Sequence, residues 1–362
     1  MARIALLAAT ITNGDAVSND VIGMLGVLQR HGHDARIYSS PWTFDELQVW
    51  PPHQVTDFIN SLDDILIYHY TVGWDFGLEV LEELPCRKLI KYHNVTPPEF
   101  FAGYSAEHER LCRDGRQLQP MVNAGCDLYL SDSEYSLWEL LTAGADQSKC
   151  LVVPPFHHID CLHSAEPDFD VLNAYHDGQT NLLMVGRVSP NKGHAALIEA
   201  FALYHRHYNQ HSRLLLVGKE VGFETYFESL SELVARYGLE KSIIFTGGVS
   251  ESELKAYYMV ANAFVLTSEH EGFCVPLVES MAMKVPIVAY ASTAIPGTVG
   301  GAGLVWRERN PFLLAESIDF LVKNTDLSES LGLMGWRRYE QLFTNLKIET
   351  QFLSAINSLL ST

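Results

Sequence analysis

Residues 181–201 of the sequence, NLLMVGRVSPNKGHAALIEAF, predict one local structure in three consecutive parts. The apolar run 181–185 has the length and composition of a buried strand. The stretch 186–194 contains the glycines and the proline of a turn, and an apolar helical pattern then continues to residue 201. A strand that passes through a short turn into a helix is the repeating unit of a doubly wound α/β domain.

The same alternation of strand and helix continues on both sides of this stretch. A polar, turn-rich segment over 160–178 interrupts it and predicts a domain boundary. Since such alternation indicates parallel sheets with helices on both faces, we expect two doubly wound domains, 1–165 and 166–345, that face each other across a cleft. The expected strands are short runs rich in Ile, Val and Leu, at 4–9, 65–68, 88–92, 128–131, 151–153, 181–185, 214–217, 243–245, 263–266 and 286–289.

The composition excludes several other classes of protein. A chain of 362 residues with 47% hydrophobic and 19% charged residues has enough apolar material for two cores, so a disordered chain is excluded. The net charge of −19 disfavours a nucleic-acid partner. The apolar start of the chain reads as a buried strand rather than a signal peptide, and no apolar run is long enough to predict a membrane span. The six cysteines form no C-x-x-C pair, which predicts a reducing, cytoplasmic setting without zinc or a disulfide framework.

The sequence lacks two common nucleotide-binding motifs, and its one Asp-x-Asp lies where a metal site is not expected. No Gly-x-Gly-x-x-Gly follows any expected strand, which weighs against a dinucleotide-binding oxidoreductase, and there is no Walker A segment. Asp168-Phe169-Asp170 has the form of an Asp-x-Asp metal motif. It lies in the polar interdomain segment rather than at a strand end, so we interpret it as a solvated linker and expect no metal site.

The turn after the strand 181–185 has the chemistry to hold two phosphate groups. Arg187 offers a forked donor and Lys192 a compact positive charge, and the amino terminus of the following helix adds unpaired N–H groups. The alternative is a solvated turn with two ordinary surface cations.

A second segment, 267–282, favours the binding site over that alternative. Its order is again strand, loop and helix, and Pro276 suits the first turn of the helix because it lacks an N–H. The amides of residues 272–275 then gather at the positive helix end, where an anion is stabilised. Glu271 precedes this helix and Glu279 lies near its start, so both carboxylates are able to point into one pocket.

With these residues in place, the sequence resembles the retaining GT-B glycosyltransferases of family four, the group 1 type, which carry a Glu, seven residues and a second Glu. The resemblance extends over the chain through Gly186-Arg187 with Lys192-Gly193, Leu216-Val217-Gly218, 245–249 and 302–305. It implies a GT-B fold whose last helix, 346–362, packs back toward the first domain. It also implies transfer of a hexose from a UDP- or GDP-linked donor to a glycan or lipid-linked glycan, with retention and without a cofactor or divalent metal.

The resemblance assigns a role to each candidate residue. Glu279 binds the ribose hydroxyls of the donor and Glu271 the hydroxyls of the transferred sugar. Arg187 and Lys192 hold the diphosphate, and Val249 lies against the nucleobase. The remaining expected donor contacts come from the start of the second helix, at Gly272, Phe273, Cys274 and Val275.

Two further candidates lie in the first half of the chain. His93 follows the strand 88–92 and, in similar enzymes, contacts the donor sugar near the reacting carbon. Its alternative is a histidine satisfied by local backbone groups. Gly14, between Asn13 and Asp15, allows a ligand to approach the backbone closely, or it serves only as a turn.

The chain departs from the family pattern at three places. It has one glycine near position 14 where two are frequent, Cys274 where glycine is frequent, and no acidic residue after the proline of Ile295-Pro296-Gly297. The other functions left open are a nucleotide-sugar hydrolase or epimerase and a nucleotide-sugar-binding protein without catalysis. The base, the sugar, the acceptor, the linkage and the oligomeric state are also left open, as is the choice between a glycosyl-enzyme intermediate and attack on the face that the leaving group departs from.

A basic and aromatic patch suggests contact with a membrane surface. Such a patch would suit anionic lipid headgroups and a lipid-linked acceptor. The alternative is a solvated helix face, because acidic residues interrupt the patch and the domain is acidic. The residues concerned are Arg110, Arg113 and Arg116 with Phe100, Phe101 and Tyr104, interrupted by Glu107, Glu109 and Asp114.

Overall fold

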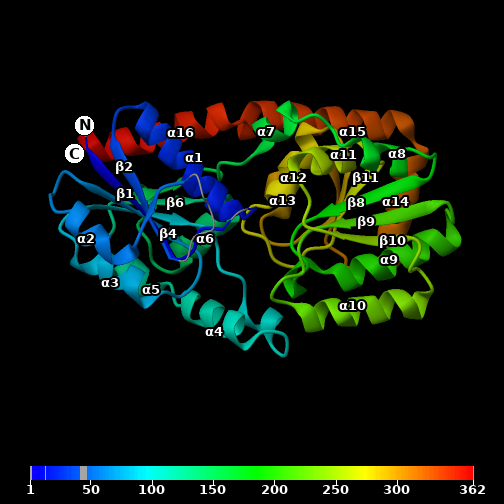
Figure 1. The fold of residues 1–362 in the computed structure, drawn as a ribbon, viewed down its shortest axis with the longest axis horizontal. Coiled ribbons are helices and arrows are strands. Elements are labelled where there is room, and N and C mark those ends of the chain that lie inside the picture. The colour runs from blue at the N-terminus through cyan, green and yellow to red at the C-terminus, as the bar shows by residue number, and fades with distance from the viewer. Residues whose placement is uncertain (1, 13, 41–46, 362) are drawn as a thin grey trace. The chain divides into compact units, whose positions relative to one another are not determined.

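The computed structural model of the chain describes residues 2–12, 14–40 and 47–361. These residues form two compact units in which helices and strands alternate (Figure 1). The first unit consists of 1–99, 107–157 and 344–362, and the second of 100–106 and 158–343. The chain thus leaves the first unit for the second between residues 157 and 158. This boundary lies before the one at 165/166 that the polar segment suggested.

The first unit is built on a seven-stranded sheet in the order β3-β2-β1-β4-β5-β6-β7, and all neighbouring strands are parallel. All five strands expected in this half are present. Two were not expected, β2 and β3, because β2 carries charged residues and β3 is very short. The strands are β1 (Arg3–Ala8), β2 (Asp34–Tyr38), β3 (Val49–Trp50), β4 (Ile65–Tyr70), β5 (Arg87–Tyr92), β6 (Leu128–Ser131) and β7 (Cys150–Val152).

The last helix, α16 (Asn345–Ser361), completes the core of the first unit. Ile348, Phe352 and Ile356 are fully buried in the cluster that also contains Ile4 of β1. The ring of Phe352 meets that of Phe156 edge-on at a centroid distance of 6.1 Å. The other helical elements are α1 (Ala16–Arg30), η1 (Pro52–Gln54), α2 (Val55–Phe58), α3 (Asp75–Glu83), η2 (Pro98–Phe101), α4 (Ala106–Gly115), α5 (Gln119–Asn123), α6 (Glu134–Thr142) and η3 (Gln147–Lys149).

The second unit is built on a six-stranded parallel sheet in the order β10-β9-β8-β11-β12-β13. The strands are β8 (Thr180–Val185), β9 (Ser212–Val217), β10 (Ile243–Gly247), β11 (Ala263–Leu266), β12 (Ile287–Tyr290) and β13 (Gly303–Trp306). The helical elements are α7 (Ile159–Ser164), α8 (Phe169–Tyr175), η4 (Pro190–Lys192), α9 (His194–His207), α10 (Glu224–Tyr237), α11 (Glu251–Val260), α12 (Val275–Ala282), α13 (Ile295–Val299), α14 (Pro311–Lys323), α15 (Thr325–Arg338) and η5 (Tyr339–Phe343).

The Asp-x-Asp segment begins a helix. Asp168 is the N-cap of α8, and its side chain accepts a hydrogen bond of 2.9 Å from the backbone N–H of Val171. An N-cap carboxylate satisfies a donor that the helix leaves unpaired, which accounts for Asp168 without a metal.

The strand order determines where ligands are expected in each unit. In both sheets the order reverses beside the first strand, between β1 and β4 and between β8 and β11. Loops at the carboxyl ends of strands near such a reversal form the ligand sites of doubly wound domains. Gly14 follows β1 and His93 follows β5, whereas Arg187 follows β8 and Glu271 follows β11. Of the helices in the described parts of the chain, none combines the length and apolar character that crossing a membrane requires.

Candidate functional site

The turn after β8 and the loop after β11 are tied together by backbone contacts. Gly193 has φ +68°, and a Cβ there would collide with the carbonyl oxygen of Thr267, so only glycine fits without strain. The Thr267 hydroxyl donates to the Gly193 carbonyl at 2.8 Å. The backbone N–H of Glu269 donates to the Asn191 carbonyl at 2.8 Å, so the two predicted motif segments share one rigid corner of the second unit.

Lys192 and Glu271 form an ion pair at this corner. The Lys192 ammonium lies 2.8 Å from Oε1 and 2.9 Å from Oε2 of Glu271. The Glu271 side chain is 7% exposed and that of Lys192 is 21% exposed. Burial alone would lower the pKa of Lys192, but the Glu271 carboxylate outweighs it and the pKa is raised above its usual value. The lysine is therefore positively charged at neutral pH.

The amino terminus of α12 is shaped by Cys274. This residue is the N-cap and has φ +74°, in the left-handed region that favours glycine. Its side chain is buried, and burial raises the pKa of its thiol. The neighbouring Phe273 carbonyl accepts a hydrogen bond of 2.8 Å from the Thr298 hydroxyl. The backbone at position 274 explains why glycine suits this position, and cysteine adds a buried side chain to a constrained loop.

Glu279 lies one turn into α12 and has a different environment from Glu271. Its Oε2 accepts a hydrogen bond of 2.8 Å from the Tyr258 hydroxyl of α11. Burial raises the pKa of Glu279 to about 7, and the hydrogen bond from Tyr258 only partly opposes this shift. The two glutamates of the motif therefore differ, because Glu271 is paired with a cation and Glu279 with a neutral phenol.

Arg187 and Val249 lie on other loops of the same unit. Arg187 is exposed, and its Cζ lies 5.2 Å from the centroid of the buried Phe223 ring, a cation–π contact that helps to hold the guanidinium in place. Val249 is half-buried directly before Ser250, the N-cap of α11.

A large cavity of the second unit lies elsewhere. It has a volume of about 780 Å³, and its lining includes Trp306, Leu313 and Phe320 but none of the predicted site residues. The volume of a cavity therefore does not indicate where the predicted site residues lie.

In the first unit, Gly14 has φ +80° and directly precedes Asp15, the N-cap of α1. A Cβ at Gly14 would meet no atom within 4 Å, so glycine is favoured there by the backbone angle rather than by lack of space. Asn13 lies outside the described residues.

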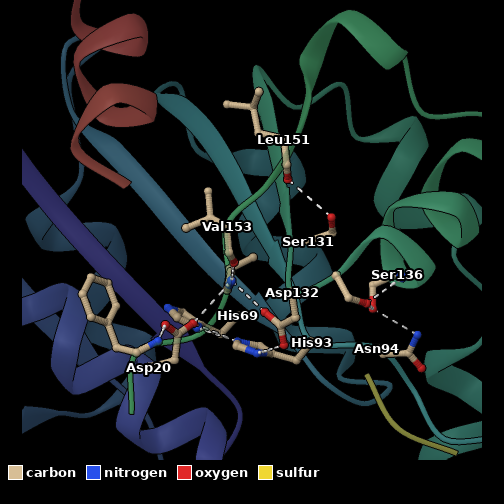
Figure 2. Close-up of polar contacts among 12 residues, drawn as sticks. Asp20, His69, His93, Asn94, Ser131, Asp132, Ser136, Leu151 and Val153 are labelled. Carbon is tan, nitrogen blue, oxygen red and sulfur yellow. Dashed lines mark hydrogen bonds and ion pairs between the residues drawn. The ribbon is translucent and has the colours of Figure 1, made fainter. Parts of the chain in front are cut away.

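His93 is a member of a buried polar cluster (Figure 2). Its Nδ1 lies 3.0 Å from Oδ2 of Asp132, and its Nε2 lies 2.9 Å from Nδ1 of His69. The Lys91 ammonium lies 2.6 Å from Oδ1 of Asp132 and also donates to the Val153 carbonyl. Both ring nitrogens of His93 thus meet side chains, not the local backbone groups of the alternative interpretation.

The sequence did not point to the other members of this cluster. Asp20 of α1, with both side-chain oxygens buried, lies 3.7 Å from Nε2 of His93 and 3.8 Å from the Lys91 ammonium. Lys91 and His69 stand inside apolar strand sequences, where a polar residue costs free energy unless it has a partner. That mismatch is the sequence signal by which they could have been found.

The arginines of the suggested basic patch have acidic partners. Arg116 donates to the Val95 carbonyl at 2.7 Å and to Glu139 at 3.0 Å. Arg113 pairs with Glu109 along α4. Arg110 lies 3.4 Å from Asp114 in the same helix. These pairs reduce the positive charge that the patch would offer to an anionic surface.

Parts of this chain are similar in sequence to a protein family and to several known proteins. Residues 168–335 match the family described as glycosyl transferases group 1. The O-antigen chain mannosyltransferase B of Escherichia coli is 35% identical over 123 residues, 34% of this chain and 32% of that protein. The mannosylfructose-phosphate synthase of Agrobacterium fabrum is 34% identical over 110 residues, 30% of this chain and 24% of that protein. The aligned part of the chain spans about a third or less of the length of these relatives.

Solved structures resemble the whole chain. Sucrose-phosphate synthase from Thermosynechococcus elongatus has a TM-score of 0.78 at 18% identity, with both chains covered completely. Anabaena HepE, solved with UDP and glucose, has a TM-score of 0.76 at 18% identity over 99% of this chain and 100% of that chain. WaaG, a glycosyltransferase of lipopolysaccharide biosynthesis, has a TM-score of 0.74 at 13% identity over 97% and 98% of the two chains. The predicted GT-B fold, with two Rossmann-like parallel-sheet domains, is confirmed.

Proposed function

Because residues 168–335 match the family described as glycosyl transferases group 1, we propose that the chain transfers a hexose from a nucleotide diphosphate sugar to a glycan or lipid-linked glycan, with retention of configuration. The donor is linked to UDP or GDP. The proposed reaction uses no bound cofactor and no divalent metal.

The observation that supports this proposal best is the corner formed by Lys192, Glu271 and the amino terminus of α12. It presents a buried carboxylate, an ammonium and the N–H groups of a helix start within one short stretch of structure. A nucleotide sugar has the complementary groups, namely sugar hydroxyls that donate to the carboxylate and phosphate oxygens that accept from the cation and the amides.

The proposed mechanism depends on the leaving group. As the bond between the anomeric carbon and the diphosphate oxygen breaks, negative charge builds on the diphosphate, and fixed cations stabilise that charge. Lys192 and Arg187 take this role in place of a metal. The acceptor oxygen bonds to the anomeric carbon on the face that the diphosphate leaves, and its proton passes to a phosphate oxygen.

The other residues bind parts of the donor. Glu279 accepts hydrogen bonds from the ribose hydroxyls, and Glu271 from those of the transferred sugar. Val249 lies against the nucleobase, and His93 of the first unit contacts the transferred sugar. Gly14 and the remaining residues of the α12 amino terminus contribute backbone contacts, namely Gly272, Phe273, Cys274 and Val275.

The relatives suggest which donors to test first. Several are named mannosyltransferases, and two from Mycobacterium tuberculosis are named as GDP-mannose-dependent. The HepE structures contain UDP or UDP-glucose. For the acceptor we propose a glycan in the cytoplasm, reached by transient contact with the membrane surface when it is lipid-linked, although the paired arginines of α4 give such contact little support.

The test is a donor panel followed by a turnover assay. GDP-mannose, UDP-glucose and related nucleotide sugars are first compared by thermal shift. The best donor is then incubated with and without glycan acceptors while the free nucleoside diphosphate is measured. A transferase releases the diphosphate at a substantial rate only with an acceptor. Release without acceptor would indicate a hydrolase or epimerase, and stabilisation with no release under any condition would indicate a binding protein.

A further inference from the structure

The buried cluster around His93 contains a hydrogen bond between two imidazole rings. The rings of His69 and His93 are nearly parallel, at 15°, with centroids 5.2 Å apart. Because Nδ1 of His69 lies only 2.9 Å from Nε2 of His93, the rings meet edge to edge rather than face to face. Asp132 lies at the other edge of His93, so the three side chains form a chain of hydrogen bonds from Asp132 through His93 to His69.

The carboxylate of Asp132 determines which nitrogen of each imidazole ring carries the hydrogen. Burial opposes ionisation of Asp132, but His93 and Lys91 outweigh it and lower the pKa of Asp132 to about 2, so this carboxylate is ionised and accepts. His93 therefore carries its hydrogen on Nδ1. When His93 is neutral its Nε2 is a hydrogen-bond acceptor, and His69 must place its own hydrogen on Nδ1 to donate to it.

The far end of the chain is also buried. Nε2 of His69 has no hydrogen-bond partner among the described residues, and the side chain is 1% exposed. Burial, with further contributions from His93 and Lys91, lowers the pKa of His69 well below its usual value. His69 is therefore uncharged at neutral pH.

The charged and titratable groups that face His93 come from four parts of the first unit. They are Asp20 of α1, His69 of β4, Lys91 of β5 and Asp132 after β6. The second oxygen of Asp20 accepts a hydrogen bond of 2.8 Å from the N–H of Phe156. Burial raises the pKa of Asp20, although Lys91 and His93 oppose this shift.

The same residues include the ligand types of a metal site. Asp20, His69 and His93 each offer one ligand atom, and these three atoms lie within 4.8 Å of one another. However, the Lys91 ammonium already brings a positive charge to this buried group, 2.6 Å from Asp132 and 3.8 Å from Asp20. A divalent ion would have to be placed beside that ammonium with no water to screen the repulsion. The cluster is therefore better explained by shared protons than by a cation.

We propose that His69 is a positioning residue for His93 and that the two rings take up a proton as one unit. In the neutral pair both rings carry hydrogen on Nδ1. When the pair gains a proton from solvent, an N–H bond forms at Nε2 of His69, the N–H bond at Nδ1 of His69 breaks, and an N–H bond forms at Nε2 of His93. The positive charge then resides on His93, between Asp132 and Asp20, and His69 remains neutral.

The consequence for catalysis rests on the proposed function. If His93 faces the transferred sugar, its charge affects the reacting carbon, which becomes electron-poor during transfer. A neutral, oriented His93 favours that state and a protonated one opposes it. His69 and Asp132 would then control turnover without contacting the substrate.

The test uses ¹⁵N NMR of the imidazole nitrogens in the full chain, with His69→Phe and Asp132→Asn used to assign the two rings. We expect both rings to carry hydrogen on Nδ1 at neutral pH, and we expect His69 to change to the Nε2–H form at the pH where His93 gains its charge. An Nε2–H form of His69 at neutral pH, or two separate transitions, would overturn the proposal. A stoichiometric divalent metal in protein purified without chelator would overturn it too. Because NMR needs no turnover, this result is independent of whether the chain is a transferase.

The kinetic arm uses His69→Gln, which keeps a hydrogen-bonding group, and His69→Phe, which does not. His53→Phe, at an exposed position of η1 in the same unit, is the matched control. We expect His69→Phe to lower kcat at least tenfold with a smaller change in KM, and His69→Gln to restore part of kcat but with an altered pH profile. If His69→Phe folds as well as the His53→Phe control and retains the kcat and the pH profile of the unchanged chain, His69 does not position His93.

Discussion

The ammonium of Lys192 lies almost equally far from the two carboxylate oxygens of Glu271, at 2.8 and 2.9 Å. This pair joins two segments that the sequence had assigned to different parts of the donor, the diphosphate and the transferred sugar. Under the proposed function, we expect Lys192 to meet the oxygen that joins those two parts, where negative charge develops as the bond breaks. The pairing also holds both side chains in place before the donor arrives.

The first prediction concerns the diphosphate. Arg187→Ala and Lys192→Ala should each weaken binding of the nucleoside diphosphate by about 1.5 to 3 kcal/mol, or roughly 10- to 100-fold, because a charge-assisted contact is lost. Binding of the bare nucleoside should change little. Isothermal calorimetry with both ligands measures the difference, and Lys323→Ala, which removes an exposed ion pair of the same unit, is the control. Equal losses for the nucleoside would contradict a phosphate role.

The second prediction is that turnover does not require a divalent metal. Arg187 and Lys192 supply fixed positive charge, and Asp168 is occupied as the N-cap of α8. Turnover measured after dialysis against excess chelator should therefore stay within about twofold of the untreated rate. Loss of activity that manganese or magnesium restores would show that carboxylates outside this scheme bind a catalytic metal.

The third prediction follows from the pKa of about 7 for Glu279. Because the folded protein holds this proton more tightly than the unfolded chain, whose usual value is 4.5, the contribution of Glu279 to stability is greatest below about pH 4.5 and decreases as pH rises to about 7. The decrease amounts to up to about 3 kcal/mol. Glu279→Gln should remove this pH dependence in denaturant unfolding, whereas Glu199→Gln, at an exposed position, should not.

The fourth prediction concerns the backbone of Cys274, which has φ +74°. Cys274→Gly and Cys274→Ala both remove the thiol, but only glycine adopts this angle without steric cost. The glycine variant should therefore be more stable than the alanine variant by about 1 kcal/mol, even though glycine gives the unfolded chain more freedom. Urea denaturation of the two variants measures the difference. An alanine variant as stable as the glycine variant would show that the loop relaxes to another conformation.

The positions of the candidate residues of the second unit on their elements could be predicted from local patterns. Arg187 and Glu271 follow strands, Lys192 precedes a helix, and Glu279 lies within one. Their roles were assigned through the family resemblance and stay predictions. The strand Asp34–Tyr38 was missed because its charged residues alternate with apolar ones, so it contains no long apolar run.

The His93 cluster could not be found in the same way. Lys91 and Asp132 lie far apart in the sequence and meet only because β5 and β6 are neighbours in the sheet. A lone lysine or histidine inside an apolar strand indicates that a buried polar group needs a partner, but the sequence does not identify that partner. Only the sheet order and the burial show that these side chains face one another.

The last prediction separates the two glutamates by the ligand that each binds. The nucleoside diphosphate keeps the ribose but lacks the sugar, so Glu279→Gln should weaken its binding by about 1 to 3 kcal/mol when hydrogen bonds to the ribose are lost. Because ionised Glu279 is the better acceptor, the affinity of the unchanged chain should also rise from pH 6 to pH 8, and this rise should disappear in Glu279→Gln.

Glu271→Gln should behave differently, because Glu271 is paired with Lys192 and its proposed ligand is the transferred sugar, which the diphosphate lacks. Removal of its charge leaves the Lys192 ammonium without its counter-charge and more available to phosphate, so the affinity for the diphosphate should be equal or higher. The damage should appear as a loss of kcat with the intact donor, since a contact to the sugar matters most as the anomeric carbon becomes electron-poor. Calorimetry with the diphosphate and kinetics with the donor, on both variants, test the division. If Glu271→Gln loses the diphosphate as severely as Glu279→Gln does, the two glutamates act together on the nucleotide and neither is specific for the sugar.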